Sequence, residues 1–321
     1  MEATLAGTRV LVTGATGFIG SHLCVALANT GAQVIALRRP GSSPRWPESL
    51  DGRVEWVEAD LRDVARLTEA VRAARATRVF HLAAATTVER GFQIVAEMIA
   101  TNLVGTINLL RALDGTGYEC FIQTGSAEEY GAGDPPFQES ASLRPVSPYS
   151  ASKAAATLFC EMYHRTLNCP IIILRPFLVY GPGQSPTKLI PQAIFAALAN
   201  RDLPMTSGQQ TREFTYIDDV IDGYLRAAVT PGAIGQTINL GTGVAYKIVD
   251  VVRLIIELTG STMTPRVGAL PDRPGEIWAY QGDHTKAQTV LGWTPAVPLP
   301  DGLRRTIAWY RLAVEQGQVT P

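Results

Sequence analysis

Short apolar segments alternate with longer segments of mixed polarity along the first half of the chain. The apolar segments are rich in Val and Ile, as is typical of buried strands, and comprise residues 9–14, 33–37, 78–84, 120–126 and 170–176. Between them, segments of helical length lie at 18–30, 63–75, 92–113 and 150–167. Strand and helix in this alternation predict an α/β fold, a doubly wound parallel sheet with helices on both faces and right-handed crossovers.

The second half of the chain has a looser pattern. Pro and Gly interrupt it in GPGQSPTKLIP, ALPDRPGE and GWTPAVPLP. This composition predicts a smaller, loop-rich region that could close over a ligand.

Composition narrows the class of protein. The chain has 321 residues with 28 basic and 29 acidic side chains and a net charge of -1, without a basic block, so we expect a small-molecule substrate and neither nucleic acid nor membrane as partner. The four cysteines are scattered, and no leader-like segment or long apolar run is present, so we expect a cytoplasmic protein. The four histidines lack ligand spacing, and we expect no metal site.

The sequence TGATGFIG follows the first predicted strand and opens a helix. Its glycines, Gly14, Gly17 and Gly20, allow a tight turn and let backbone amides approach a pyrophosphate at the positive end of the helix. Because the motif lies at a strand-to-helix junction, it predicts that this turn, including Phe18 and Ile19, binds a dinucleotide. A dinucleotide-binding turn at this junction makes the predicted sheet Rossmann-like. A purely structural glycine turn is the alternative.

The end of the second predicted strand carries Arg38 and Arg39. In NAD-binding sheets an acidic residue about 20 positions beyond the glycines binds the ribose, whereas an arginine accommodates the 2′-phosphate of NADP. The pattern therefore favours NADP over NAD, with two solvated arginines as the alternative. A further strand is expected at the start of VEADLRD, and Asp60 and Leu61, which follow it, are placed to meet the adenine, although an ordinary loop aspartate explains the pattern equally well.

Residues 147–153, SPYSASK, place Tyr149 and Lys153 one helical turn apart on one face. The pair alone is weak evidence for catalysis, because a solvated helix face with an extended lysine has the same spacing.

The chain as a whole resembles the extended short-chain dehydrogenase/reductases of the nucleotide-sugar epimerase, dehydratase and reductase group. The resemblance covers nearly the whole chain, through TGATGFIG, ADLRD, HLAA, TNLVGTINLL, TGSAEEYG, SPYSASK, LRPFLVYGPGQ, REFTYIDDV, INLGTG, RPGEIW and LGWTPAVPLPDGL. It implies a cofactor-binding domain, 1–180 with about 214–241, and an interleaved nucleotide-sugar-binding domain, about 181–213 and 242–321. It also implies cofactor contacts from Leu82, Ala83, Ala84 and Pro176.

The resemblance assigns Tyr149 and Lys153 to the catalytic YxxxK pair of the family, and Ser126 to the hydroxyl residue after the preceding strand. A hydride can leave or reach a sugar carbon only when a proton leaves or reaches its oxygen. A free phenol, with a pKa of about 10, is a poor base at neutral pH. We therefore expect the Lys153 ammonium and an oxidised nicotinamide to lower the pKa of Tyr149, and Ser126 to bind the same oxygen. Lys153 is also expected to hold the nicotinamide ribose.

Ser126 is followed by Ala127, Glu128 and Glu129. Related 4,6-dehydratases and decarboxylases typically place Asp or another polar residue and then Glu there, because their chemistry needs further acids and bases. Ala127 cannot protonate a leaving hydroxyl, and SxEEYG most resembles 4-ketoreductases of the GDP-4-keto-6-deoxymannose reductase type. Glu128 keeps a dehydratase or decarboxylase open. For Glu129 we favour capping or solvation of a loop.

Substrate contacts are implied at Arg212 and Arg273, which match the arginines that grip the nucleotide diphosphate in this family. Surface ion pairs are the alternative. Lys188 and Glu276 are weaker candidates. Leu178 stands where many relatives have Asn near the sugar phosphates, which leaves the sugar and the nucleotide open.

The leading hypothesis is an NADPH-dependent reductase of a nucleotide-linked 4-keto-6-deoxy sugar, with Tyr149 as proton donor. The alternatives are an epimerase or 4,6-dehydratase that retains NAD(P), with Glu128 as base, and a catalytically silent NADP-binding sensor.

The helices at about 94–112 and 150–167 carry more apolar residues than one buried stripe needs. The resemblance implies that they pair across a homodimer as a four-helix bundle.

Overall fold

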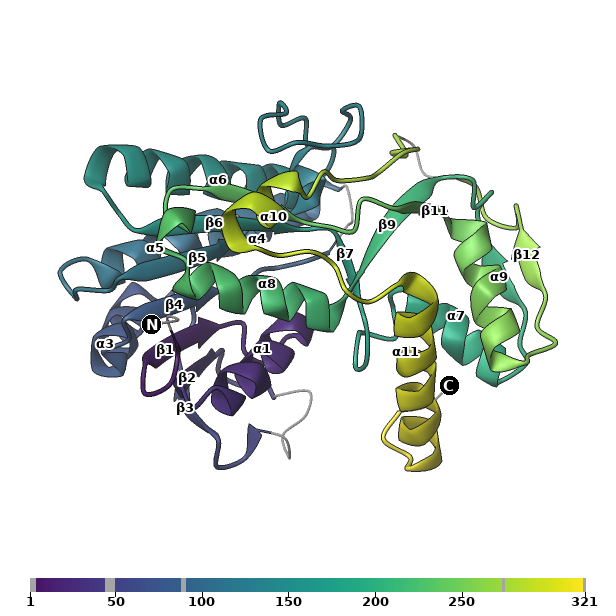
Figure 1. Cartoon of the computed structure of the whole chain (residues 1–321), viewed down its shortest axis with the longest axis horizontal. Coiled ribbons are helices and arrows are strands. Elements are labelled where there is room, and N and C mark those ends of the chain that lie inside the picture. Colours follow the sequence, from purple (N-terminus) through teal and green to yellow (C-terminus); the bar gives the residue numbers. More distant parts are fainter. Residues whose placement is uncertain (1–3, 44–49, 88–90, 273–274, 320–321) are drawn as a thin grey trace.

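A computed structural model describes residues 4–43, 50–87, 91–272 and 275–319. Its main sheet has seven strands in the order β10-β6-β5-β4-β1-β2-β3, and every neighbouring pair is parallel (Figure 1). The strands are β1 (Arg9–Thr13), β2 (Gln33–Arg38), β3 (Val54–Glu58), β4 (Arg78–His81), β5 (Cys120–Thr124), β6 (Ile171–Pro176) and β10 (Thr237–Leu240). The predicted Rossmann-like α/β fold is confirmed.

Helices cover both faces of this sheet because alternate strand residues point to opposite sides. In β1, Val10 and Val12 belong to one hydrophobic cluster and Leu11 to the other. The first cluster includes residues of α1 (Phe18–Asn29) and α8 (Ile217–Val229), and the second includes residues of α3 (Val64–Ala74), α5 (Gly105–Leu113) and α6 (Pro148–Leu167). Apart from the edge strand β3, whose residues are partly buried or exposed, the strands are thus mostly buried, which explains their nearly continuous apolar sequences.

The segment predicted as one helix at 92–113 changes its helix type along its length. It runs through η1 (Phe92–Ile94), α4 (Val95–Met98), a π-helical turn, η2 (Ile99–Val104), and α5. The segment has 22 residues and contains an 18-residue window with a mean hydropathy of 1.3, so by length and composition it could cross a membrane. This is weak evidence for a span, because core helices of soluble proteins have the same properties, and this segment packs on α3 and α6.

A second part of the fold lies on the right of Figure 1 and follows the end of β6. It contains a three-stranded sheet in the order β11-β9-β7 and a two-stranded sheet of β8 and β12. Its elements are β7 (Leu178–Tyr180), α7 (Leu189–Leu198), β8 (Leu203–Met205), β9 (Thr211–Tyr216), β11 (Ala245–Lys247), α9 (Ile248–Thr259), β12 (Pro265–Val267) and α11 (Leu299–Glu315). Between β9 and β11 the chain returns to the main sheet through α8, η4 (Pro231–Ala233) and β10. The two parts are therefore interleaved, as expected, while the exact domain boundaries stay a prediction.

Candidate active site

The glycine turn forms the first piece of the site, between β1 and α1. Gly14 has a left-handed φ of +71°, and a Cβ there would lie 2.6 Å from the backbone nitrogen of Ala83. At Gly20 a Cβ would lie 2.1 Å from the carbonyl oxygen of Gly14. Gly17 caps α1 without a side-chain hydrogen bond, and the first turn of the helix, which begins at Phe18 and Ile19, holds no acidic residue. The positive end of α1 can therefore receive a pyrophosphate, so the turn fits a dinucleotide.

Arg38, at the end of β2, has protein partners of its own. Its Nη2 atom lies 3.0 Å from Oε1 of Glu58 at the end of β3, and its guanidinium lies over the Trp56 ring, 5.6 Å from the ring centroid. A carboxylate in this position would repel a 2′-phosphate. Arg39 is exposed. The arrangement does not support the predicted preference for NADP.

The remaining predicted cofactor contacts lie near the carboxyl ends of neighbouring parallel strands. Leu82, Ala83 and Ala84 follow β4 and are partly exposed, and Pro176, also partly exposed, ends β6. In doubly wound sheets, ligands bind at this edge.

Asp60 and Leu61 follow β3 and are held by contacts within the protein. Asp60 accepts hydrogen bonds from Arg62, including 2.6 Å from Nη2, and these bonds lower the pKa of its carboxyl. Leu61 is buried in the second hydrophobic cluster. Their approach to adenine stays a prediction.

Ser126, Tyr149 and Lys153 come together from two elements. Ser126 follows β5, while Tyr149 and Lys153 lie in the first turns of α6. That helix begins where it does because Ser147 caps it, accepting from the backbone N–H of Ser150 at 3.0 Å, and because Pro148 occupies its first position. A side-chain hydrogen bond joins Tyr149 to Ser126. The structure thus brings the three predicted catalytic residues together.

The protonation of this group differs from the expectation. Burial of its hydroxyl group is the largest cause that raises the pKa of Tyr149, and the nearby Glu128 carboxylate is the second. The hydrogen bond with Ser126 lowers this pKa in part. The Tyr149 residue as a whole is partly exposed. Lys153 is buried, its Nζ donates to the carbonyl oxygen of Thr124, and burial lowers its pKa. The expected lowering of the Tyr149 pKa is therefore not produced by the protein's own groups.

The loop after Ser126 forms a short 3-10 turn, η3 (Ala127–Glu129). Ala127 is buried in an aromatic cluster with Tyr130 and Phe137, whose rings stack with centroids 4.9 Å apart. Glu128 is partly exposed, and its backbone N–H donates to Oγ of Ser126 at 3.2 Å. Position 128 therefore carries a carboxylate near Ser126, whereas position 127 offers only a methyl group.

Glu129 is fully buried, so of the two roles that we favoured for it, capping and solvation of a loop, solvation is wrong. The capping role is correct, because its Oε1 accepts from the backbone N–H of Ser126 at 2.7 Å. Its Oε2 accepts from Nε of Arg175 on β6 at 2.9 Å, and Arg175 is itself 2% exposed. Sequence reasoning missed Arg175, although a charged residue inside an otherwise apolar strand is a signal for a buried ion pair.

A second missed residue is Asn102, which lies in the π-helical turn and is buried. Its side chain accepts from the backbone N–H of Ala85 at 2.8 Å and donates to Oγ of Ser152 at 2.9 Å. It therefore ties the loop after β4 to the helix that carries Tyr149 and Lys153. The only sequence signal was an amide inside an apolar helix.

Two of the predicted substrate residues pair with each other. Nη2 of Arg212, on β9, lies 2.5 Å from Oε1 of Glu276, and both side chains are mostly buried. Nη1 of Arg212 donates to the carbonyl oxygen of Ile277 at 2.6 Å. Lys188 is exposed before α7, and Leu178 is partly exposed on β7. Arg273 lies outside the described residues.

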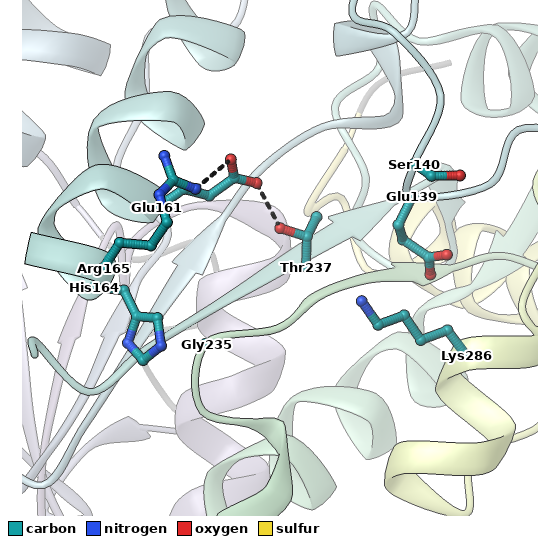
Figure 2. A pocket seen from close by; sticks show the side chains of 8 residues that line it. All are labelled: Glu139, Ser140, Glu161, His164, Arg165, Gly235, Thr237 and Lys286. Carbon is teal, nitrogen blue, oxygen red and sulfur yellow. Dashed lines mark hydrogen bonds and ion pairs between the residues drawn. The ribbon is translucent and has the colours of Figure 1, made fainter.

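A separate hollow of about 360 Å³ lies at the edge strand β10 (Figure 2). Its polar lining includes Glu161 and Arg165 from α6 and, on the other side, Glu139 and Lys286. None of the predicted site residues lines it. Oε1 of Glu139 accepts from the backbone N–H of Asn239 at 2.8 Å, so this side chain satisfies a donor on β10.

Comparison with known proteins finds similar chains. Mouse dTDP-D-glucose 4,6-dehydratase is 32% identical over 316 residues, which cover 94% of this chain and 88% of that protein. The structure of UDP-glucose 4-epimerase from Thermotoga maritima with UDP-glucose has a TM-score of 0.89 and 29% identity, over 95% of this chain and 99% of that one. The structure of UDP-glucuronic acid 4-epimerase from Bacillus cereus, in complex with UDP-glucuronic acid and NAD, has a TM-score of 0.86 and 31% identity, over 94% of this chain and 99% of that one.

The match to a family model covers a smaller part of the chain, but this part includes the candidate site. Residues 10–241 match the model of the NAD dependent epimerase/dehydratase family. This range contains the glycine turn, Ser126, Tyr149 and Lys153, so it includes every residue of the predicted catalytic group. The chain therefore belongs to the NAD-dependent epimerase/dehydratase family, the extended short-chain dehydrogenase/reductases that act on nucleotide sugars.

Proposed function

We propose that the protein is a nucleotide-sugar 4-epimerase that keeps NAD bound through its catalytic cycle. The observation that carries the proposal is the contact of Tyr149 with Ser126 at the same edge of the main sheet as the glycine turn, with only a methyl group at Ala127. The similar proteins are named as epimerases and 4,6-dehydratases. They support the alternative drawn from the sequence better than the leading hypothesis of a 4-ketoreductase.

Tyr149 would take the proton from the C4 hydroxyl of the sugar while the hydride leaves the same carbon, and would return it when the hydride comes back to the opposite face. Bound NAD supplies the hydride acceptor and, when oxidised, a positive charge. Ser126 would hydrogen-bond the sugar oxygen and hold the Tyr149 hydroxyl. Lys153 would hold the nicotinamide ribose and favour the phenolate. Burial opposes that phenolate, so the two positive charges have to offset it.

NAD is the better supported cofactor. The Bacillus cereus epimerase holds NAD, and in this chain Arg38 is already paired with Glu58. Gly14, Gly17 and Gly20 would receive the pyrophosphate.

Elimination of water is the second candidate reaction, and Glu128 is the observation that favours it. A carboxylate next to Ser126 could remove a proton from the sugar. Elimination also needs an acid for the leaving hydroxyl, and the buried methyl group of Ala127 cannot provide one. We therefore rank 4,6-dehydration behind epimerisation.

The nucleotide diphosphate would bind near Arg212, with Arg273, Lys188 and Glu276 as further candidates. Because Glu276 pairs with Arg212, a diphosphate would have to share the Arg212 guanidinium with the Glu276 carboxylate or displace that carboxylate. Leu178 would face the substrate without a polar contact.

The test is to incubate the purified protein with UDP-glucose, UDP-glucuronic acid or dTDP-glucose, without added cofactor. We expect the mass of at least one sugar nucleotide to stay constant while NMR shows inversion at C4. A product lighter by one water would instead identify a dehydratase, and turnover of a 4-keto sugar that consumes added NAD(P)H would identify a reductase. Either result would overturn the proposal.

We further propose a homodimer formed through the 92–113 segment and α6. Exposed apolar side chains lie along both elements, namely Phe92, Ile99, Val104, Leu158 and Phe159. Four helices from two copies would cover them. The predicted cytoplasmic location stays a prediction.

A further inference from the structure

The pair of Glu129 and Arg175 carries an inference about how the candidate catalytic serine is held. Neither side chain faces solvent, since Glu129 is 0% and Arg175 2% exposed. Oε1 of Glu129 accepts from the backbone N–H of Ser126, while Oε2 accepts from Nε of Arg175. One carboxylate thus connects the end of β5 to β6.

The contacts extend further from the arginine. Nη1 of Arg175 donates to the hydroxyl of Tyr130 at 3.1 Å, and its guanidinium lies 4.8 Å from the centroid of that ring. The hydroxyl of Tyr130 donates to Oδ1 of Asn239 on β10 at 2.7 Å. Glu139, at the hollow of Figure 2, accepts from the backbone N–H of Asn239. A continuous chain of hydrogen bonds therefore runs from the edge strand to Ser126.

The backbone around Ser126 is shaped to admit this carboxylate. A Cβ at Gly125 would lie 2.8 Å from Oε1 of Glu129 and 3.1 Å from Cγ of Arg175. A side chain there would therefore displace the pair. Buried ion pairs contribute little net stability compared with apolar packing, so a role in fixing geometry accounts better for this one.

The pair also affects the electrostatics of the site. The negative charge of Glu129 raises the pKa of Tyr149 and acts in the same direction on Lys153. Glu128 raises the pKa of Tyr149 as well, and burial is the largest cause for both groups. Removing the Glu129 charge alone should therefore make Tyr149 easier to deprotonate.

We propose that Glu129 and Arg175 are positioning residues, which hold Ser126 in place for the reaction and set the charge felt by Tyr149. The inference rests on the proposed function. Neither residue is expected to touch the substrate, because both are buried behind Ser126.

The experiment compares Glu129→Gln and Arg175→Lys with the wild type. In Glu129→Gln we expect kcat to fall about tenfold or more, with KM within about threefold, because a displaced hydroxyl affects chemistry more than binding. The acid limb of the kcat profile should also move to lower pH. Arg175→Lys keeps the charge but not the planar fork, so we expect a smaller fall in kcat and an unmoved pH profile.

The matched control is Asp219→Asn. Asp219 is also a buried carboxylate held by backbone amides, but its partners are Ala296 and Val297. A wild-type kcat and pH profile in folded Glu129→Gln would overturn the inference, as would changes no larger than those in the control. If Glu129→Gln does not fold, an unchanged kcat in Arg175→Lys overturns it.

Failure of the proposed function is detected separately. A wild type that epimerises no sugar nucleotide refutes the epimerase, whatever the variants do. In that case a crystal structure of Glu129→Gln, or of Arg175→Lys if the first does not fold, decides the inference. A Ser126 hydroxyl still bonded to Tyr149 would overturn it, and a displaced one would support it.

Discussion

Glu213 connects three parts of the fold and provides a quantitative test of the structure. Its side chain is fully buried on β9. Its carboxylate accepts from the backbone N–H of Thr242 at 2.5 Å, after β10, and from that of Gly282 at 2.7 Å, before α10 (Thr285–Leu291). Burial raises its pKa from 4.5 to about 7, and hydrogen bonds from these amides and from Gly243 offset only part of that rise.

The shift has a defined sign and size. The folded protein binds the Glu213 proton more tightly than the unfolded chain does. The resulting stability is fully present below the unfolded pKa of 4.5 and is lost as the pH rises through the folded value of about 7. At 1.36 kcal/mol for each pKa unit, the free energy of unfolding should lose about 2–3 kcal/mol between pH 5 and pH 8 from this group.

The assay is urea unfolding of wild type and Glu213→Gln, followed by tryptophan fluorescence at several pH values. The glutamine puts an NH₂ group near backbone N–H donors, which lowers the free energy of unfolding of the variant by an amount that does not depend on pH. The difference in free energy of unfolding between wild type and Glu213→Gln should therefore shrink by about 2–3 kcal/mol from pH 5 to pH 8. Glu257→Gln, at an exposed position of α9, is the control and should show a much smaller change. A constant difference in the free energy of unfolding between wild type and Glu213→Gln across this range would show that folding does not raise the pKa of Glu213.

Three further predictions test the site and the assembly. Tyr149→Phe should lower kcat about 10²–10⁴-fold in a turnover assay, whereas a sensor would keep its function. Gly20→Ala should abolish NAD binding in calorimetry, because its methyl group would lie 2.1 Å from a backbone oxygen of the turn, while Gly232→Ala, with nothing within 4 Å, should bind normally. Leu158→Glu should give a monomer in light scattering, and Leu312→Glu, similarly exposed on α11, should leave the dimer intact.

Five of the seven strands of the main sheet, all except β3 and β10, match the apolar segments of the sequence closely. The apolar segments at 33–37 and 120–126 became β2, Gln33–Arg38, and β5, Cys120–Thr124. Likewise, the helix expected at 150–167 is α6, Pro148–Leu167. Strands buried on both faces need continuous apolar residues, so their pattern is clear without any knowledge of the tertiary fold. The glycine turn was equally visible, because its function depends on local backbone geometry.

Features that depend on contacts across the fold could not be predicted. The carboxylate beside Arg38 comes from Glu58 on a neighbouring strand, 20 positions further along the chain, and only the register of β2 and β3 brings the two together. Burial of Glu129 depends on Arg175 in the same way. The short strands β8 and β12, of three residues each, are below the length at which periodicity is informative.

The surroundings of Ala127 constrain how this scaffold could evolve towards a different chemistry. Its methyl group is packed with Tyr130, Phe137, Phe177 and Tyr280, all of them buried. An acidic side chain at this position would meet aromatic rings rather than water, so it would be both too large and unsolvated. A lineage acquiring an acid here would first have to repack the rings, and a single codon change would give an unstable protein before it gave a new reaction.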